Sequence, residues 1–297
     1  MFSFCSDPSL LPDWQWMACY LTTASHFAMY RSVLVVLLLL ALAAPMALGM
    51  GFAGALAMRS ANRVLKIIGT IYVSMVRGVP DIIFFLFVPL AIDQGVEYIR
   101  HRVLCPDWTE PVRQGNDFVV CAAAKMPLAT DPLWVHNVWG FSLALVAFAL
   151  VFGAFAANTL HGAMNAVPQG QLETGEAFGM TRAQTFRRIL LPQMWIYALP
   201  GLSNLWMILT KATPLLFLLG IQDVVFWARE LGGQKTGHYD YVHPDWRVWY
   251  FLGVLVFYLG MTWASQKFFD WLMARLNRGQ ATSGGEALRK APGTVPA

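Results

Sequence analysis

Charged residues are scarce in this sequence. Of its 297 residues, 13% are Asp, Glu, Lys or Arg and 57% are hydrophobic. Soluble globular domains carry about 25% charged residues, so this composition excludes an ordinary soluble domain and indicates an integral membrane protein. The net charge is only +4. No basic stripe with interleaved aromatic residues is present, so nucleic-acid binding is not indicated.

Motifs of the common catalytic sites are also lacking. Residues 232–236, Gly-Gly-Gln-Lys-Thr, resemble a fragment of a phosphate-binding loop, but the upstream glycine is missing. No Ser/His/Asp or Cys/His arrangement stands out, and no Cys/His spacing is typical of a metal site. We therefore expect no enzyme activity, no metal and no cofactor in this chain. Any ATP hydrolysis that drives it must come from a separate chain.

Long apolar runs, in contrast, are abundant. Five segments reach the roughly 20 residues that a helix needs to cross a bilayer: 32–57, 67–92, 138–160, 194–221 and 248–266. In lipid each must be helical, because every backbone polar group has to be bonded within the segment. The prediction is an all-α integral membrane protein with about five transmembrane helices. Prolines inside the spans are expected to kink or break them: Pro45, Pro80, Pro89, Pro200 and Pro214.

Basic residues concentrate in three of the segments between and after these spans, namely 58–66, 161–192 and 267–297. The positive-inside rule places all three in the cytoplasm. The N-terminus and the loops at 93–137 and 222–247 then lie outside, and the C-terminus lies inside.

Three parts of the chain follow from this topology. Residues 1–31 are expected to be an extracytoplasmic segment, with an interfacial helix at 16–31. Residues 32–275 form the transmembrane domain. Residues 276–297 are rich in Gly, Ala, Ser, Thr and Pro and are expected to be a disordered cytoplasmic tail.

The four cysteines all fall on the expected outer side. Cys105 and Cys121 lie in the 93–137 loop, where an oxidising periplasm permits a disulfide that would stabilise the loop by about 3 kcal/mol. Cys5 and Cys19 allow other pairings, and four free thiols remain the alternative.

The polar loop at 161–192 carries the most informative pattern. It contains Glu173-Thr174-Gly175, then Gly179, then Ile189-Leu190-Leu191-Pro192. This resembles the EAA loop of bacterial ABC-importer permeases, in which Glu-Ala-Ala, Gly and Ile-x-Leu-Pro occur at the same spacing. The departure is Thr174-Gly175 where that family usually has two alanines. The resemblance implies that this loop contains a coupling helix that docks on a cytoplasmic ATPase.

Local signals in the loop predict two short helices, at 169–178 and at about 182–190. Gly179 between them suits a left-handed C-terminal position. Thr181 with Gln184 three residues later is a capping-box pattern.

The first short helix presents the residues that we expect to dock on the ATPase. They comprise a small apolar face, two carboxylates for basic groups around a groove, and the glycine at the bend: Leu172, Ala177, Phe178, Glu173, Glu176 and Gly179. The alternative is an ordinary solvated loop between two spans.

A second resemblance involves the span at 67–92. Arg77-Gly78-Val79-Pro80 is similar to the Arg-Gly-Thr-Pro signature of polar-amino-acid permeases. Ala166-Val167-Pro168, Ala198-Leu199-Pro200 and Lys211-Ala212-Thr213 extend that similarity over residues 30–275, with the opine and basic-amino-acid branch closest. Many relatives have Lys-Asp-Thr at the last of these motifs, so the group that pairs with Lys211 stays open.

Charges inside spans are costly and usually functional. Lys211, Asn204, Thr213 and Arg77 are candidates to line the translocation path. In the alternatives, Lys211 pairs with Asp81 or a backbone carbonyl, Arg77 pairs with Asp81 at the Pro80 bend, and polar groups of the fourth span bond helix to helix.

Together these patterns favour a permease subunit of an ATP-driven ABC importer for a polar amino acid or a relative such as an opine. The resemblance implies a bacterial inner-membrane location, an ABC ATPase dimer, a second permease subunit (a copy or a related chain) and a periplasmic solute-binding protein as partners. The alternatives are a self-sufficient secondary transporter or channel and a membrane-anchored assembly protein.

Overall fold

The structure is a computed structural model that describes residue 5 and residues 11–276. The expected tail at 276–297 falls, apart from its first residue, outside the described residues. Most of the described chain is helical.

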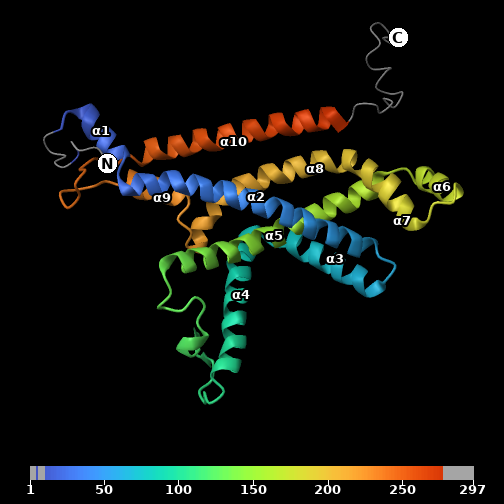
Figure 1. The fold of residues 1–297 in the computed structure, drawn as a ribbon, viewed down its shortest axis with the longest axis horizontal. Helices are drawn as coiled ribbons and strands as arrows, with labels where there is room; N and C mark the ends of the chain where they lie inside the picture. Colours follow the sequence, from blue (N-terminus) through green and yellow to red (C-terminus); the bar gives the residue numbers. More distant parts are fainter. Residues whose placement is uncertain (1–4, 6–10, 277–297) are drawn as a thin grey trace, which may run out of the picture.

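Four long helices run lengthwise along the molecule: α2 (Ala24–Arg59), α5 (Leu133–Ala166), α8 (Leu191–Ala212) and α10 (Arg247–Leu276) (Figure 1). Helix α3 (Arg63–Gly78) returns beside the C-terminal part of α2, and α4 (Asp81–Leu104) stands across the long helices. The short helices α1 (Asp13–Leu21) and α9 (Val224–Gly232) lie at one end. Helices α6 (Gln169–Ala177) and α7 (Arg182–Thr185) lie at the other end.

Among the described helices, four are long and apolar enough to cross a membrane, namely α2, α4, α5 and α10. The span expected at 194–221 is α8 continued by the 3-10 segment η5 (Thr213–Leu219). The span expected across 67–92 is divided at Pro80, one of the prolines expected to kink or break a span, so this break is confirmed. Val79 is extended, with ψ 143°, and the chain restarts as α4 at Asp81. Pro80 explains the break, because proline has no N–H to donate and disfavours helical geometry in the residue before it.

The prediction of one continuous helix at 16–31 is wrong. Helix α1 ends at Leu21, Thr23 is extended with ψ 158°, and α2 begins at Ala24. The Thr22 hydroxyl donates to the carbonyl of Ala18 at 2.9 Å, which supplies one of the last carbonyls of α1 with a donor. Residues 24–31 therefore extend the first long helix instead of lying apart from it.

Small residues let α2 and α5 cross closely. A Cβ built on Gly51 would lie 2.6 Å from the Cβ of Ala156, and one built on Gly54 would lie 2.8 Å from the Cβ of Ala157. Glycine and alanine at such crossings bring backbones together, which is how helices gain packing energy inside a membrane. Beside this crossing, the rings of Phe85 and Phe148 lie 4.5 Å apart and join α4 to the core.

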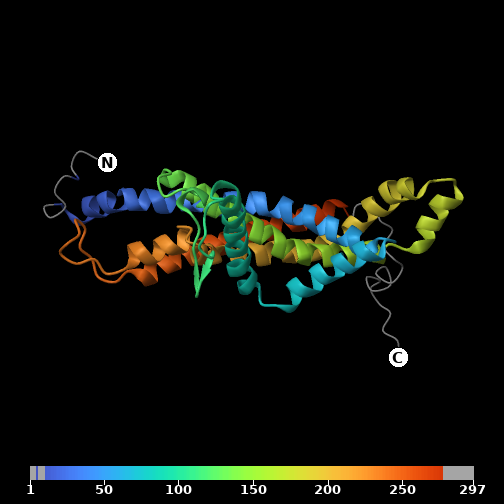
Figure 2. The same cartoon turned by 90° about the horizontal axis from the view of Figure 1, so that it is seen from below.

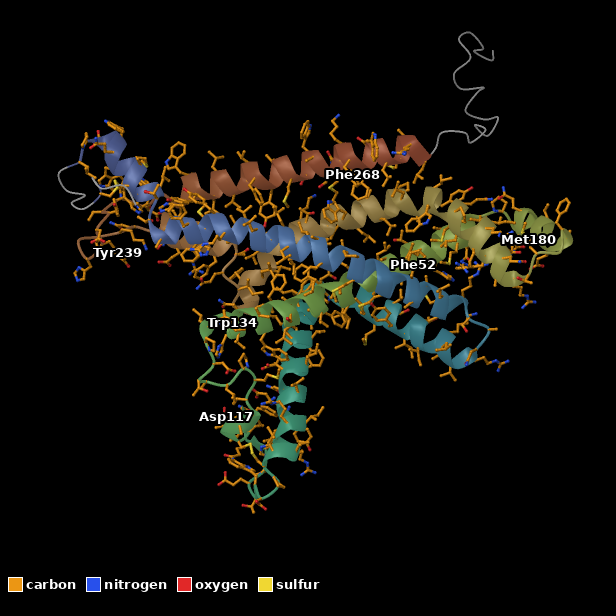
Figure 3. All side chains as sticks on the ribbon, viewed as in Figure 1. Phe52, Asp117, Trp134, Met180, Tyr239 and Phe268 are labelled. Carbon is orange, nitrogen blue, oxygen red and sulfur yellow. A yellow bond between two sulfur atoms is a disulfide. The ribbon has the colours of Figure 1, made fainter. Side chains whose placement is uncertain are left out.

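The region expected as a loop at 93–137 contains regular secondary structure, and we call it the arm. It consists of the second half of α4, a hairpin of β1 (Arg113–Gln114) with β2 (Asp117–Phe118), and η3 (Ala122–Ala124). Cys105 and Cys121 are joined by a disulfide, and buried Glu97 accepts from the Lys125 ammonium at 3.3 Å. Asp117, at the hairpin, is labelled far from the long helices in Figure 3.

A buried polar chain fixes α1 to its neighbours. The hydroxyl of Tyr20 lies 2.9 Å from Nε2 of His243 and accepts from the Tyr250 hydroxyl at 3.1 Å. Nε2 of His26 lies 2.6 Å from the same Tyr250 hydroxyl. A second disulfide joins Cys5 to Cys19. Helix α1 is thus held by α2, by α10 and by the segment between α9 and α10.

Candidate functional site

Residues 169–190, called here the α6–α7 hairpin, project beyond the ends of α2 and α5 (Figure 2). The hairpin contains α6, a bend, α7 and a single π-helical segment, η4 (Phe186–Leu190), which runs directly into α8. Met180 is labelled at this projecting end in Figure 3. The two short helices predicted from sequence are confirmed.

The bend depends on Gly179. Its φ is +81°, a left-handed value that a Cβ disfavours. The N–H of Gly179 donates to Glu176 at 2.9 Å and the N–H of Met180 donates to Gly175 at 3.0 Å. These two bonds form a complete Schellman motif that ends α6, so the left-handed position predicted for Gly179 is confirmed.

The predicted capping box at the start of α7 is confirmed as well. The N–H of Gln184 donates to Oγ1 of Thr181 at 3.4 Å, and the N–H of Thr181 donates to Oε1 of Gln184 at 2.8 Å. Both ends of the bend are therefore fixed by local hydrogen bonds.

Gly175 is one of the two residues that depart from the alanine pair of the EAA pattern. A Cβ on Gly175 would lie 2.5 Å from Cδ1 of Ile189 and 3.5 Å from Oγ1 of Thr185. The glycine lets α6 rest directly on η4. An alanine would require Ile189 to turn its terminal methyl group aside, which a flexible side chain can do.

The hairpin is anchored in a buried apolar cluster at the ends of three long helices. Leu160 and Met164 of α5 pack there with Leu190, Met194 of α8 and Ala55 of α2. Leu172 is half-buried against this cluster, so its side chain faces the protein's own core. Leu172 therefore does not share the exposed surface of the other predicted docking residues.

The other predicted docking residues share one exposed surface. Glu173, Glu176, Ala177 and Gly179 are exposed, and Phe178 is 83% exposed. A large aromatic side chain at that exposure, beside two carboxylates and on a rigid support, has the character of a binding contact more than of a core residue.

Helix α8 has a row of exposed residues along one face, called here the exposed stripe of α8. Tyr197, Asn204, Ile208 and Lys211 are all exposed at spacings that place them on one face. Two of the predicted path residues, Asn204 and Lys211, therefore lie on the same surface. Among the described residues, no carboxylate lies within ion-pair distance of Lys211.

The other two path candidates lie apart from this stripe. Thr213 is fully buried, donates to the carbonyl of Thr210 and lies 2.9 Å from the Tyr258 hydroxyl, so it bonds η5 to α10. Arg77 is exposed in the last turn of α3. In the described part of the chain it forms no ion pair with Asp81, because the Pro80 break puts the two on different helices.

Asp223 is a buried group that the sequence reading missed. Its side chain is fully buried at the start of α9, where Oδ1 accepts from the N–H of Phe226 at 2.8 Å. Oδ2 has no hydrogen-bond partner among the described residues, and burial raises the pKa of Asp223 to about 6. An Asp directly ahead of the apolar run at 224–228 is an N-cap signal that could have located it.

Comparison with known proteins gives these features a context. The family model described as binding-protein-dependent transport system inner membrane component matches residues 47–281. The histidine/lysine/arginine/ornithine transport system permease protein HisQ of Salmonella typhimurium is 34% identical over 186 residues, which are 63% of this chain and 69% of that protein. The arginine ABC transporter permease protein ArtQ of Haemophilus influenzae is 31% identical over 210 residues, or 71% of this chain and 76% of that protein.

A solved structure has the same fold. The crystal structure of an amino acid ABC transporter with histidines aligns with a TM-score of 0.59 and 19% identity, over 90% of this chain and 100% of that chain. The permease-like helical fold expected from the sequence is confirmed. Since the family model covers most of the chain, this protein belongs to the family of binding-protein-dependent transport system inner membrane components.

Proposed function

We propose that this chain is one of two membrane subunits of an ATP-driven importer for a polar amino acid or a close relative, and that its α6–α7 hairpin docks on a separate ATPase. The observation that carries the proposal is the hairpin itself. It combines an 83% exposed Phe178, two exposed carboxylates, and an anchor in the apolar cluster at the ends of α2, α5 and α8. A movement imposed on the hairpin would reach these helices as a rigid-body movement.

The names of the relatives support the solute class. HisQ and ArtQ are named for the transport of basic amino acids. Such solutes share a carboxylate whatever their side chain. We assign the exposed stripe of α8 to the path, with Lys211 placed to attract that carboxylate and Asn204 to donate a hydrogen bond to it. A second permease subunit would close the path on the opposite side, and an external solute-binding protein would deliver the solute.

We further propose that the hairpin lies in the cytoplasm and that α1, the arm and α9 lie on the opposite, periplasmic side. Arg59 ends α2, and Arg63 and Lys66 lie in the first turn of α3, at the hairpin end of these helices (Figure 1), as the positive-inside rule requires. The disulfides Cys5–Cys19 and Cys105–Cys121 belong to the proposed outer side, where an oxidising compartment maintains them.

Uptake by reconstituted vesicles tests this function. The chain would be purified from its native membrane with the subunits that accompany it and sealed into vesicles with the solute-binding protein outside. Labelled arginine or histidine should accumulate only when ATP is enclosed with the ATPase. Accumulation driven by an ion gradient without ATP, or by this chain alone, would instead establish a self-sufficient transporter and overturn the proposal.

A further inference from the structure

A cavity of about 650 Å³ opens between the proposed outer ends of α2 and α5 and the segment that joins η5 to α9. This volume falls in the range typical of ligand sites. The cavity lies at the opposite end of the long helices from the α6–α7 hairpin, as the positions of α9 and α6 in Figure 1 show. It shares no residue with the exposed stripe of α8 or with the hairpin.

The cavity has a polar part and an apolar part. The polar side chains are Arg31, Ser32, His136, Asn137 and Gln222, and among the described residues no Asp or Glu lines the cavity. The guanidinium of Arg31 has one weak contact, from Nε to the carbonyl of Phe27 at 3.4 Å. Among the described residues, no carboxylate lies within ion-pair distance of it. An exposed cation without an acidic neighbour favours an anionic ligand.

The apolar part continues from the cation along α2. Val35 and Leu38 follow Arg31 by four and seven residues, a rise of about 10 Å, and Phe141 and Trp227 complete this wall. Leu38 is 51% exposed and Val138 is 56% exposed. Arg31, Asn137 and Gln222 are exposed as well, so the rim carries both polar and apolar side chains, which suits a position where headgroups meet hydrocarbon.

The position along the chain agrees with this chemistry. Arg31 directly precedes the apolar run 32–57, so its charge sits at headgroup level while the run enters the bilayer. A ligand that satisfies both parts has an anionic head and a hydrocarbon tail.

We propose that this cavity binds one anionic phospholipid of the outer leaflet, with its phosphate at Arg31 and an acyl chain along Val35 and Leu38. A zwitterionic headgroup would bring an amine into a site where the described residues offer it no carboxylate. The choice of leaflet rests on the orientation proposed above; the site itself does not depend on transport.

The test counts phospholipid that stays bound to the purified protein, by native mass spectrometry after delipidation and titration with phosphatidylglycerol. Two variants change the site differently. Arg31→Gln removes the charge, and Gly140→Leu fills the cavity, where a Cβ meets nothing within 4 Å. Arg102→Gln on the arm, an arginine outside the cavity, is the matched control.

Wild type and Arg102→Gln should each retain one phosphatidylglycerol per chain and bind phosphatidylethanolamine at least tenfold more weakly. Both site variants should lose the tightly bound lipid while keeping the same elution profile as wild type. Equal retention by all four proteins would overturn the proposal. Displacement of the lipid by inorganic phosphate at equal concentration would assign the cavity to a small anion instead. Lipid binding without ATP-driven uptake would leave the lipid site standing and refute only the proposed function.

Discussion

Gly179 and Gly175 place different demands on the α6–α7 hairpin. Gly179 is needed for its backbone. Its φ of +81° costs a residue with a Cβ about 1–2 kcal/mol, although no described residue lies within 4 Å of where that Cβ would be. Gly175 instead provides space, because the terminal methyl group of Ile189 occupies the volume of its missing Cβ and would have to turn aside for an alanine. The first glycine shapes the bend, and the second sets how closely α6 approaches η4.

Lys211 offers a test of the proposed path. Replacing it by Gln should lower ATP-driven uptake at least tenfold, about 1.4 kcal/mol of activation free energy, because the solute carboxylate loses its cation. Lys267→Gln, which alters an exposed lysine of α10, serves as the control and should leave uptake unchanged. Both variants should co-purify with the ATPase as wild type does. Unaltered uptake by Lys211→Gln would remove this residue from the path.

Asp223 makes the stability of the protein depend on pH. Its pKa in the folded protein, about 6, lies above the ordinary value of 3.8, so the folded state holds the proton more tightly than the unfolded state. The stabilisation is complete below the ordinary pKa and is lost as the pH rises through about 6. The melting temperature of the purified protein should therefore fall over this interval.

Asp223→Asn should remove that dependence. Asparagine still accepts from the N–H of Phe226 as an N-cap, and it carries no charge to bury. At pH 7 the variant should be more stable than wild type by on the order of 1–3 kcal/mol, as measured by thermal unfolding between pH 4 and 8. Parallel melting curves for the two proteins would show that the carboxyl group does not titrate in this way.

At the scale of elements, the crossing of α2 and α5 depends on residues without side chains. Gly51→Leu should destabilise the protein by about 1–3 kcal/mol through overpacking, since its Cβ would lie 3.2 Å from the backbone of Ala156 and Ala157. Gly49→Leu, two residues away on the same helix, meets nothing within 4 Å and should melt like wild type. Thermal unfolding of both purified variants checks this, and equal melting temperatures would argue against a close crossing.

The arm is the element that the sequence described least well. The sequence predicts a loop at 93–137, whereas α4 continues to Leu104 and a hairpin and η3 follow. The Gly115-Asn116 pair between β1 and β2 is a hairpin signal, and Gly115 has a φ of +64°. Without a known packing partner for so short a pair of strands, that signal alone does not predict a sheet.

At the scale of the whole molecule, the sequence predicted what composition and local geometry decide. The helical membrane class follows from the apolar runs, and the two short helices of the hairpin follow from Gly179 and the Thr181 capping box. The contacts between segments far apart in the sequence could not be predicted from it. Tyr20 and His243 are 223 residues apart, and no periodicity reports that they meet.

The same limit explains why the candidate residues do not all share one surface. Leu172 and Phe178 are both apolar and close in sequence, but Leu172 packs against the apolar cluster beneath α6. Thr213 is polar like Asn204 and Lys211, but its hydroxyl contacts Tyr258 of α10. The burial of a side chain depends on which element packs against its side of the helix. A single amino-acid sequence does not specify that neighbour.

The most direct test of the central claim is the amount of ABC ATPase that co-purifies with this chain from its native membrane, compared for wild type, Gly179→Asn and Gly179→Arg. Asparagine tolerates the left-handed geometry, whereas arginine combines backbone strain with a long charged side chain on the exposed docking surface. Wild type and Gly179→Asn should recover the ATPase, and Gly179→Arg should lose it while still inserting in the membrane. Recovery of equal amounts by Gly179→Arg, or of none by a folded wild type, would contradict the docking role of the hairpin.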